Sequence, residues 1–442
     1  MKKIHVIGAG RSSIVMIRTF LSLCKKNNWF LVVADFNKDL ALNAIDNNFQ
    51  FAKAIKLDIN NDDARRDFVK DSDIVISMLP AVFHVLVAKD CIFYSKPMVT
   101  ASYVSNEMKK LDKAAKTVDV ILLNEMGLDP GIDHMSAMKI INEVKSFGGL
   151  ITSFKSFCGG LVHPEYDDNP WNYKFTWNPR NVVLAGQGTA LYMDGKKQKY
   201  IPYNNLYKRI EKLDIDDCGP FEAYANRNSL QYKNQYGLIN IDTILRGTIR
   251  KKGFCEAWNI FIELGMTDDS YVINNSNKLK ISEFTNLFLP NKSLKIQDNF
   301  CSFLNIKINS ELFNKFEWLG LFSNDYVEVN NATPAQVLQS ILEKKWKLNS
   351  NDKDMVVMQH QFKYNLSGVE KQIISDLVVY GDSLEETAMA KTVGLPIVFA
   401  VKHILNGNIK QKGVVIPVSE EIYIPVLEEL SNFGIIFLDR AS

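Results

Sequence analysis

The chain has 442 residues, of which 46% are hydrophobic, and it carries 52 Lys and Arg residues against 50 Asp and Glu residues. This length exceeds what one hydrophobic core supports, so we expect two or three domains of roughly 150 residues each. The formal net charge of +2 excludes a global electrostatic field that would attract nucleic acid or an anionic membrane. Any anionic ligand must therefore be recognised locally, by particular side chains.

Targeting and metal signals are weak in this sequence. Apolar stretches such as 394–401 are shorter than the ~20 residues that span a bilayer, and Arg11 interrupts the apolar segment at the N-terminus. We expect a soluble, cytoplasmic protein that binds neither a membrane nor a nucleic acid. The six cysteines form no CxxC pair and have no nearby histidine at zinc spacing, so we expect buried thiols and no metal site.

The first 145 residues alternate strand-like and helix-like segments. The helix after the first strand places Ile14, Ile17, Phe20, Leu21 and Cys24 on one face. Such alternation predicts a parallel, doubly wound α/β sheet with right-handed crossovers. Six apolar runs are its expected strands: "KIHVIG", "FLVVAD", "AIKLDI", "DIVISML", "PMVTAS" and "VDVILLNE".

The pattern changes after 124–135. The aromatic, turn-rich stretch 159–180 predicts a second domain with a mixed sheet, and 268–349 has the apolar spacing of helices. A helix near 386–405 and the runs "GVVIPV" and "GIIFLD" close the chain. We therefore expect the following division: a dinucleotide-binding domain in 1–125 and 385–442, a substrate-binding α+β domain in 126–267 and 350–384, and a helical insert in 268–349.

The turn "GAGRSS" follows the first strand and opens the first helix. In a dinucleotide site the first glycine makes the tight turn and the second lets the backbone approach the pyrophosphate. Gly8 and Gly10 fit these roles. Ser13 replaces the third glycine, and its hydroxyl could instead cap the helix or reach a phosphate oxygen. The alternative is a strand, turn and helix that bind no ligand.

Asp35 ends the second strand, where the residue that contacts the adenosine ribose belongs. Its carboxylate would accept hydrogen bonds from both ribose hydroxyls and would repel the 2′-phosphate of NADP. Arg11 and Lys38 favour the opposite choice, because either cation could pair with that phosphate. We expect NAD as the preferred cofactor and NADP as the alternative. Asp58 is either an adenine-side contact or an ordinary helix N-cap.

Five further segments carry a resemblance that is more specific than the glycine turn. They are "TASY" (100–103), "NEMGLDPGIDHM" (124–135), "FCGGLVHPEYDDNPWNYKFTWNPRNVVLAG" (157–186), "FEAYANRNSL" (221–230) and "TILRGTIRKKGF" (243–254). Over nearly its whole length the chain resembles the glutamate-forming saccharopine dehydrogenases. The resemblance implies a Rossmann-type cofactor domain completed by the C-terminal tail, a mixed-sheet substrate domain and a helical insert.

The resemblance also implies site residues. "ADFN" stands where NADP-using relatives carry a basic residue, which supports NAD, and "AYANR" replaces a version containing proline. The implied cofactor contacts are Gly10, Arg11, Ser12, Ser13, Asp35, Phe36, Asn37, Asp58, Ile59, Leu128, Asp129 and Pro130. The implied substrate contacts are Ser102, Tyr103, Asp129, Arg227 and the segment from Thr248 to Arg250.

The residue chemistry fits a substrate with several carboxylates. Arg227 and Arg250 lie in segments rich in glycine and aromatic residues, and arginine suits a planar carboxylate clamp, although a surface ion pair is the ordinary alternative. Asp129 follows a strand end and could hold or remove the proton of an ammonium group, with Tyr103 beside it. We expect His134 to pack within its helix and Cys158 to be an inert buried thiol.

The expected activity is therefore oxidation of the CH–NH bond of saccharopine, with NAD or NADP and water, to glutamate and 2-aminoadipate 6-semialdehyde. Two alternatives stay open: a related dehydrogenase acting on another amine or imine, such as carboxynorspermidine or lysine at its ε-amine, and a non-catalytic dinucleotide sensor. A diamine substrate would need acidic residues where Arg227 and Arg250 stand. A homodimer is possible, and the direction of the reaction stays open.

Overall fold

The computed structural model describes residues 1–215, 218–290 and 294–442. The chain forms two compact units. Unit 1 comprises 1–150 and 377–438, and unit 2 comprises 151–376 and 439–442.

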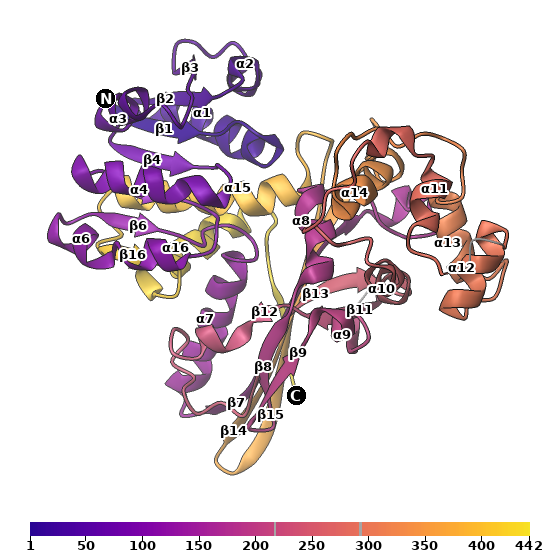
Figure 1. The fold of residues 1–442 in the computed structure, drawn as a ribbon. Coiled ribbons are helices and arrows are strands. Elements are labelled where there is room, and N and C mark those ends of the chain that lie inside the picture. Colours follow the sequence, from indigo (N-terminus) through magenta and orange to yellow (C-terminus); the bar gives the residue numbers. More distant parts are fainter. Residues whose placement is uncertain (216–217, 291–293) are drawn as a thin grey trace. The chain divides into compact units, whose positions relative to one another are not determined.

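Unit 1 is built on a seven-stranded sheet in the order β16-β6-β5-β4-β1-β2-β3, in which neighbouring strands run parallel. Apart from β16 this is the strand order 3-2-1-4-5-6 of the Rossmann fold. The predicted sheet, including its completion by the C-terminal tail, is therefore confirmed (Figure 1). The strands are β1 (Lys2–Ile7), β2 (Trp29–Asp35), β3 (Ala52–Lys56), β4 (Ile74–Ser77), β5 (Met98–Val99), β6 (Ile121–Leu123) and β16 (Gly413–Val415).

Helices connect these strands and pack closely with one another. The C-terminal helix α15 approaches α1 so closely that a Cβ on Gly394 would lie 3.0 Å from the Cβ of Met16. Only glycine permits that approach without displacement. The helices are α1 (Ile14–Asn27), α2 (Lys38–Ile45), α3 (Asp62–Lys70), α4 (His84–Phe93), α5 (Asn106–Lys109), α6 (Asp112–Thr117), α7 (Ile132–Ser146), α15 (Ala388–Leu405) and α16 (Glu420–Ser431).

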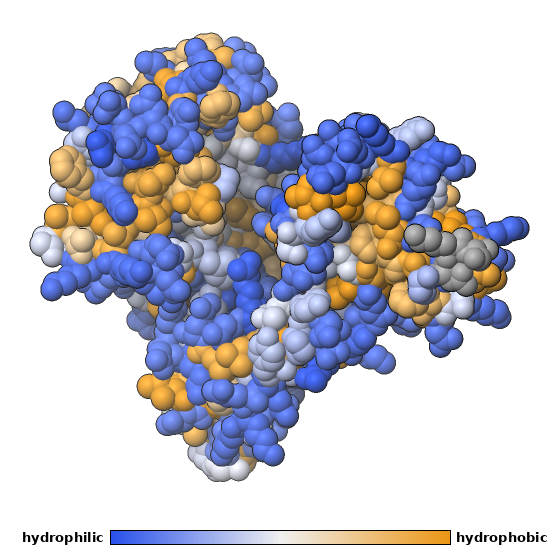
Figure 2. Space-filling model, viewed as in Figure 1, coloured by the Kyte–Doolittle hydropathy of each residue, from blue (hydrophilic) through white to orange (hydrophobic). Residues whose placement is uncertain are grey.

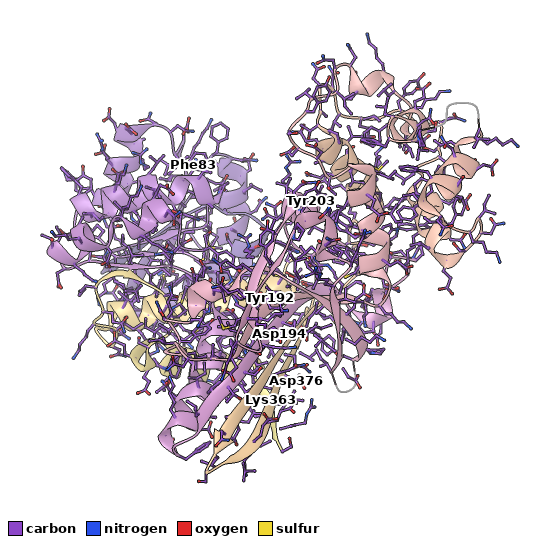
Figure 3. The ribbon with its side chains drawn as sticks, turned by 60° about the horizontal axis from the view of Figure 1, so that its bottom comes forward. Phe83, Tyr192, Asp194, Tyr203, Lys363 and Asp376 are labelled. Carbon is purple, nitrogen blue, oxygen red and sulfur yellow. The ribbon has the colours of Figure 1, made fainter. Side chains whose placement is uncertain are left out.

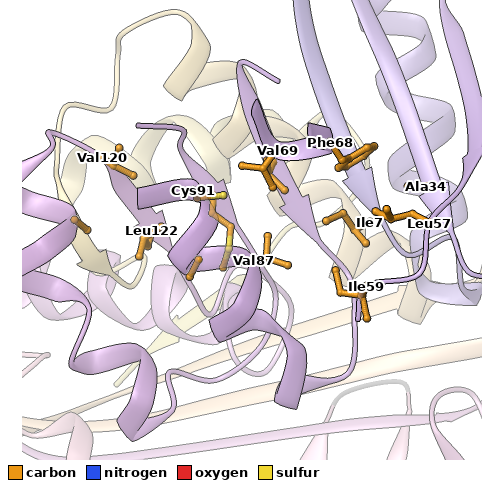
Figure 4. Packing of buried hydrophobic residues seen from close by; sticks show 14 of the residues in the cluster. Ile7, Ala34, Leu57, Ile59, Phe68, Val69, Val87, Cys91, Val120 and Leu122 are labelled. Atoms are coloured by element: carbon orange, nitrogen blue, oxygen red, sulfur yellow. The ribbon is translucent and has the colours of Figure 1, made fainter. Parts of the chain in front are cut away.

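The core of unit 1 lies beside the central strands. Ile7 of β1 and Ala34 of β2 contribute to one buried cluster with Phe68 of α3 and Cys91 of α4 (Figure 4). Burial of the larger of these side chains, such as Ile7 and Phe68, stabilises the fold by roughly 1.5–3 kcal/mol each. Both faces of β1, β2 and β4 are covered, which explains why these strands read as continuous apolar runs in the sequence.

Unit 2 contains a mixed ten-stranded sheet whose main path is β10-β11-β13-β7-β14-β15-β17. β7 and β13 pair in parallel, whereas β11 pairs antiparallel with both β10 and β13. Tyr192 and Asp194 on β8, Lys363 on β14 and Asp376 on β15 locate these strands in Figure 3. The strands are β7 (Leu150–Val162), β8 (Ala190–Asp194), β9 (Lys197–Ile201), β10 (Ile210–Ile215), β11 (Gly219–Ala225), β12 (Arg227–Asn228), β13 (Thr243–Lys251), β14 (Asp354–Leu366), β15 (Val369–Tyr380) and β17 (Leu438–Ala441).

The helices of unit 2 surround an aromatic core. Trp171 stacks on Phe261 with ring centroids 5.6 Å apart and meets Trp346 edge-on at 5.2 Å. Both tryptophans are fully buried, so α10, the segment after β7 and the end of α14 share one core. The helices are α8 (Pro179–Leu184), α9 (Tyr203–Leu206), α10 (Phe254–Leu264), α11 (Ile281–Asn286), α12 (Ile296–Leu304), α13 (Glu311–Leu319) and α14 (Pro334–Lys345).

The compact units divide the chain at other positions than the sequence suggested. Helix α7 belongs to unit 1, and the segment 268–349 with helices α11 to α14 lies within unit 2. The closing run was assigned to the dinucleotide domain, but its strand β17 joins the second sheet. Helix α16 was not predicted at all. The functional assignment of the three expected ranges stays a prediction.

The surface in Figure 2 is mainly hydrophilic and carries separate apolar patches, as folded proteins normally do. Helix α15 is 18 residues long, and by length and composition alone it could cross a membrane. However, 72% of it is buried within the protein. That burial is what a core helix shows, and the glycine contact with α1 gives it a packing role.

Candidate functional site: a glycine turn and a buried arginine

The glycine turn of unit 1 is shaped by two different constraints. Gly8 has a φ of +103°, and a Cβ there would lie 2.8 Å from the backbone oxygen of Met78, so only glycine fits. A Cβ on Gly10 would meet no atom within 4 Å. Packing within the protein therefore does not require Gly10, whereas the close approach of a pyrophosphate would. These residues fit a bound dinucleotide.

The helix that follows the turn is entered through a short 3-10 segment, Arg11–Ser13. Ser13 is buried and its hydroxyl makes no capping hydrogen bond, so the capping role considered for it is wrong. Arg11 is exposed. The turn thus places the N-terminus of α1 after β1, which is the arrangement that binds phosphate groups.

Asp35 is fixed against the turn. One carboxylate oxygen accepts the N–H of Ala9 at 2.8 Å, and the other accepts the N–H of Asn37 at 2.9 Å. Each oxygen keeps a second lone pair, so both ribose hydroxyls can still be accepted. The backbone donors orient the carboxylate before any ligand binds.

The other residues expected to contact the adenosine differ in how they are held by the protein. Asn37 caps α2 by accepting the N–H of Asp39, and Phe36 is 67% exposed. Asp58 accepts the N–H of Asn60 at 2.9 Å, whereas Asn61 caps α3, so the N-cap alternative for Asp58 is wrong. The side chain of Ile59 is part of the buried cluster in unit 1, which leaves only its backbone for a ligand.

The segment after β6 is tied into a tight loop. The hydroxyl of Tyr103 donates to a carboxylate oxygen of Asp129 at 2.9 Å. Gly131 has a φ of +146°, and a Cβ there would lie 2.1 Å from the oxygen of Gly127. Leu128 and Pro130 are buried and Asp129 is partly exposed. The loop therefore presents the Asp129 carboxylate, with Tyr103 fixing its direction.

A buried carboxylate and histidine brace this loop. Glu125 accepts the N–H of Val104 at 2.9 Å and lies 2.8 Å from Nε2 of His134. Asp133 lies 3.6 Å from the other ring nitrogen and accepts the N–H of Gly131 at 2.6 Å. His134 is fully buried, so its expected packing role is confirmed, and the neighbouring carboxylates add a bracing role that the sequence did not indicate.

A second histidine was missed from the sequence. His84 at the start of α4 lies 2.8 Å from the hydroxyl of Ser77 and 2.7 Å from that of Ser102. Its partners are 7 and 18 residues away in other elements, so no local spacing indicates the cluster. The signal that the sequence offered for this cluster was a serine at the end of β4, a second serine just beyond β5 and a histidine at the start of α4.

In unit 2, Arg250 lies on β13 and is 2% exposed. Its guanidinium faces the rings of Tyr173, Phe254 and Tyr224 at 5.2, 5.2 and 5.8 Å. Its Nη1 donates a hydrogen bond to the backbone oxygen of Ile249, and its Nε has no hydrogen-bond partner among the described residues. Among the residues that the structure describes, no carboxylate pairs with this buried cation, so the surface ion-pair alternative is wrong for Arg250.

Arg250 opens onto a cavity of about 550 Å³ within unit 2. Arg227 and Thr248 line the same cavity, together with polar side chains such as Asn226 and Asn228. Arg227 is exposed and has a φ of +53°. The structure thus brings together all the arginine and threonine side chains that were expected to bind substrate in this unit.

All six cysteines lie in the described part of the chain, and they are buried thiols there. Burial raises the pKa of Cys24 to about 12 and also raises the pKa of Cys91 and Cys255. A raised pKa lowers the thiolate fraction and with it the reactivity. Cys158 is 7% exposed on β7, in agreement with its expected burial.

Comparison with known proteins matches both parts of the chain. Residues 4–123 match the saccharopine dehydrogenase NADP binding domain, and residues 127–435 match the saccharopine dehydrogenase C-terminal domain. "Saccharopine dehydrogenase [NADP(+), L-glutamate-forming]" of Pyricularia oryzae is 36% identical over 398 residues, which cover 87% of this chain and 88% of that protein. The rat mitochondrial alpha-aminoadipic semialdehyde synthase is 36% identical over 386 residues, 41% of its longer chain.

Among solved structures, the apo saccharopine dehydrogenase (L-Glu forming) from Saccharomyces cerevisiae superposes with a TM-score of 0.90. It is 31% identical, and the alignment covers 100% of both chains. Two matching domains and this shared fold lead to one conclusion. The chain belongs to the saccharopine dehydrogenase family.

Proposed function

We propose that this chain is an oxidoreductase that uses a nicotinamide dinucleotide to convert saccharopine and water into glutamate and 2-aminoadipate 6-semialdehyde, and the reverse. The observation that carries the proposal is the cavity of unit 2, where no carboxylate of the described residues pairs with buried Arg250. A buried cation needs an anionic partner, and a substrate carboxylate supplies one. Arg227 and Thr248 line the same cavity and complete the proposed clamp.

The bound dinucleotide supplies a hydride acceptor for the carbon beside the secondary amine. That carbon releases hydride only when the nitrogen has lost its extra proton, so a base must act first. We assign this role to Asp129, whose carboxylate is oriented by the Tyr103 hydroxyl. Water then adds to the imine carbon, and the carbinolamine C–N bond breaks to leave glutamate and the semialdehyde.

NAD is our proposed preference for this chain, because Asp35 is held by two backbone N–H groups beside the glycine turn. A fixed carboxylate repels a 2′-phosphate. The relatives favour NADP instead, since the matching domain is described as NADP binding and the fungal proteins are named for NADP(+). Arg11 and Lys38, both exposed, are the residues through which NADP would be accepted. A direct comparison of both cofactors decides the choice.

The test of the proposed activity uses the full chain with saccharopine and either NAD⁺ or NADP⁺. We expect saccharopine-dependent formation of the reduced nicotinamide, with glutamate and the semialdehyde as products identified by mass spectrometry. Lysine and carboxynorspermidine are the comparison substrates. Turnover of either in preference to saccharopine would favour the related-dehydrogenase alternative, and dinucleotide binding without turnover of any amine would favour a sensor.

A cytoplasmic location and a homodimer stay predictions, and small-molecule substrates are the partners that the family membership supports.

A further inference from the structure

His84 joins the ends of two neighbouring strands in unit 1. It is the first residue of α4, directly after Phe83, which is labelled in Figure 3. Its Nδ1 lies 2.8 Å from Oγ of Ser77, the last residue of β4, and its Nε2 lies 2.7 Å from Oγ of Ser102, just beyond β5. The ring is 3% exposed and Ser77 is fully buried. The cluster therefore has fixed geometry and little access to water.

Burial lowers the pKa of His84 to about 4, so the imidazole is neutral near pH 7. A neutral imidazole has one N–H donor and one acceptor nitrogen, and the hydrogen bonds around it determine which is which. The two serine hydroxyls differ in what they can do. Ser102 is partly exposed and can direct its hydrogen toward a ligand, whereas Ser77 is enclosed by protein.

The enclosed hydroxyl of Ser77 favours one of the two tautomers. If Nδ1 carried the hydrogen, it would donate to Ser77, and the Ser77 hydrogen would have no acceptor among the described residues. Such an unsatisfied buried donor costs roughly 1–3 kcal/mol. The cost disappears when Ser77 donates to Nδ1. Nε2 then carries the hydrogen and donates to Ser102, with Thr100 Oγ1 at 3.4 Å as a weaker acceptor.

We propose that His84 is a positioning residue that fixes Ser102 as a hydrogen-bond donor, so that Ser102 recognises a carboxylate oxygen of the substrate rather than its amine nitrogen. Because Nε2–H occupies one lone pair of the Ser102 oxygen, the hydroxyl hydrogen is left to point elsewhere. An anionic oxygen accepts that hydrogen, whereas a protonated amine would compete for the remaining lone pair. The inference rests on the proposed function for the identity of the substrate.

The backbone of Ser102 is held as firmly as its hydroxyl. Its N–H donates to Oγ1 of Thr100 at 3.3 Å, and its carbonyl accepts the N–H of Glu125 at 3.0 Å. The hydroxyl rotation is therefore the main freedom that His84 has to remove. Preorganisation of a donor in this way increases affinity because less ordering remains to be done on binding.

The first test is independent of any substrate. The chain has six histidines, so nitrogen NMR of protein labelled at the histidine ring resolves each tautomer, and the His84→Gln variant identifies the His84 signals. His84→Asn serves the same purpose if the glutamine variant does not fold. At pH 7 we expect hydrogen on Nε2 and none on Nδ1. Hydrogen on Nδ1, or on both nitrogens, would overturn the proposal.

The second test asks whether His84 acts through Ser102. Ser102→Ala should raise KM for saccharopine about tenfold, the effect of losing one hydrogen bond to a charged group. His84→Leu should do the same. Combining the two should add nothing to Ser102→Ala alone, because the histidine would have no hydroxyl left to orient. His84→Gln, which keeps an N–H donor near Ser102, should retain KM within about threefold of the original.

The controls separate this inference from the proposed function. KM for the dinucleotide should stay unchanged in all of these variants, whereas a merely structural role of His84 would change both KM values together. Multiplicative effects of His84→Leu and Ser102→Ala on KM would also contradict the inference. Absence of saccharopine turnover in the unaltered chain would overturn the proposed function and the carboxylate assignment together, while the tautomer result would still stand or fall by itself.

Discussion

At the scale of single residues, Asp35 makes the cofactor choice a local electrostatic question. Its carboxylate bonds to the N–H groups of Ala9 and Asn37, so it cannot move away from a 2′-phosphate without losing both bonds. At an effective dielectric of about 20, two unit charges 4 Å apart repel by about 4 kcal/mol. Even a fraction of this energy is enough to decide between NAD and NADP.

We predict that Asp35→Ser raises kcat/KM for NADP at least tenfold and lowers it for NAD by a similar factor. Both constants are measured with saccharopine at saturation. Asp39→Ser is the matched control, because it removes the same charge from the adjacent helix without touching Ala9. An unaltered chain that already prefers NADP, or an Asp35→Ser variant with an unchanged ratio, would contradict the proposed role.

Residue type and position were sufficient to propose some site residues and insufficient to reveal the contacts of others. Gly8 and Asp35 could be proposed because a turn and a strand end each have a local pattern, whereas Arg250 was proposed mainly from the family resemblance. The link between Ser77, His84 and Ser102 has none, since β4, α4 and the end of β5 come together only in the folded sheet. The same holds for Glu125 and His134, whose contact depends on how α7 begins.

At the scale of elements, the start of α7 depends on one glycine. Gly131 combines a φ of +146° with a backbone oxygen that would lie 2.1 Å from any added Cβ. Both the strain and the clash must be relieved by moving the loop that carries Asp129. Asp133 also holds the Gly131 N–H, so the movement would break a buried hydrogen bond.

We predict that Gly131→Ala destabilises the protein by at least about 3 kcal/mol, measured by denaturant unfolding. Gly148→Ala is the control: its φ is +84° but a Cβ there meets nothing within 4 Å, so it should cost only about 1 kcal/mol. A similar loss of unfolding free energy in both variants would mean that backbone strain alone, and no steric clash, makes Gly131 necessary.

The strands and helices of the first sheet could be predicted because buried parallel strands are apolar throughout and helices repeat every 3.6 residues. The secondary structure of the C-terminal tail was harder to predict. β17 is a short, exposed edge strand with the sequence Leu-Asp-Arg-Ala, which lacks an apolar signal, so its pairing in the second sheet could not be foreseen. α16 contains Pro425, and a proline within a helical pattern argues against a helix.

At the scale of the whole molecule, buried histidines couple stability to pH. Burial lowers the pKa of His5 and of His84 to about 4 each from 6.5. In the unfolded chain both take up protons below about pH 6.5, whereas the folded chain resists until about pH 4. Folding stability is therefore complete above pH 6.5 and falls as the pH is lowered toward 4.

We predict a loss on the order of 3 kcal/mol per histidine between pH 7 and pH 4, from 1.36 kcal/mol per unit of pKa shift. Denaturant unfolding across this range measures it. His5→Gln should flatten the slope between pH 6.5 and 4 by about half of the histidine contribution. The carboxyls of Asp71 and Asp112, whose pKa values are lowered by Lys3 and Lys116, act only at lower pH. A stability that does not change between pH 6.5 and 4 would contradict the assignment.

The central claim is that buried Arg250, which pairs with no carboxylate in the described part of the chain, binds a carboxylate of saccharopine. The most direct measurement compares kcat/KM for saccharopine and KM for the dinucleotide in the unaltered chain and in Arg250→Met, which keeps much of the apolar volume without the charge. We predict about a hundredfold loss in kcat/KM for saccharopine, the typical effect of removing one partner of a buried charge pair, with KM for the dinucleotide unchanged. A rise in KM for the dinucleotide as large as the loss in kcat/KM for saccharopine would contradict the account. So would the absence of saccharopine turnover in the unaltered chain.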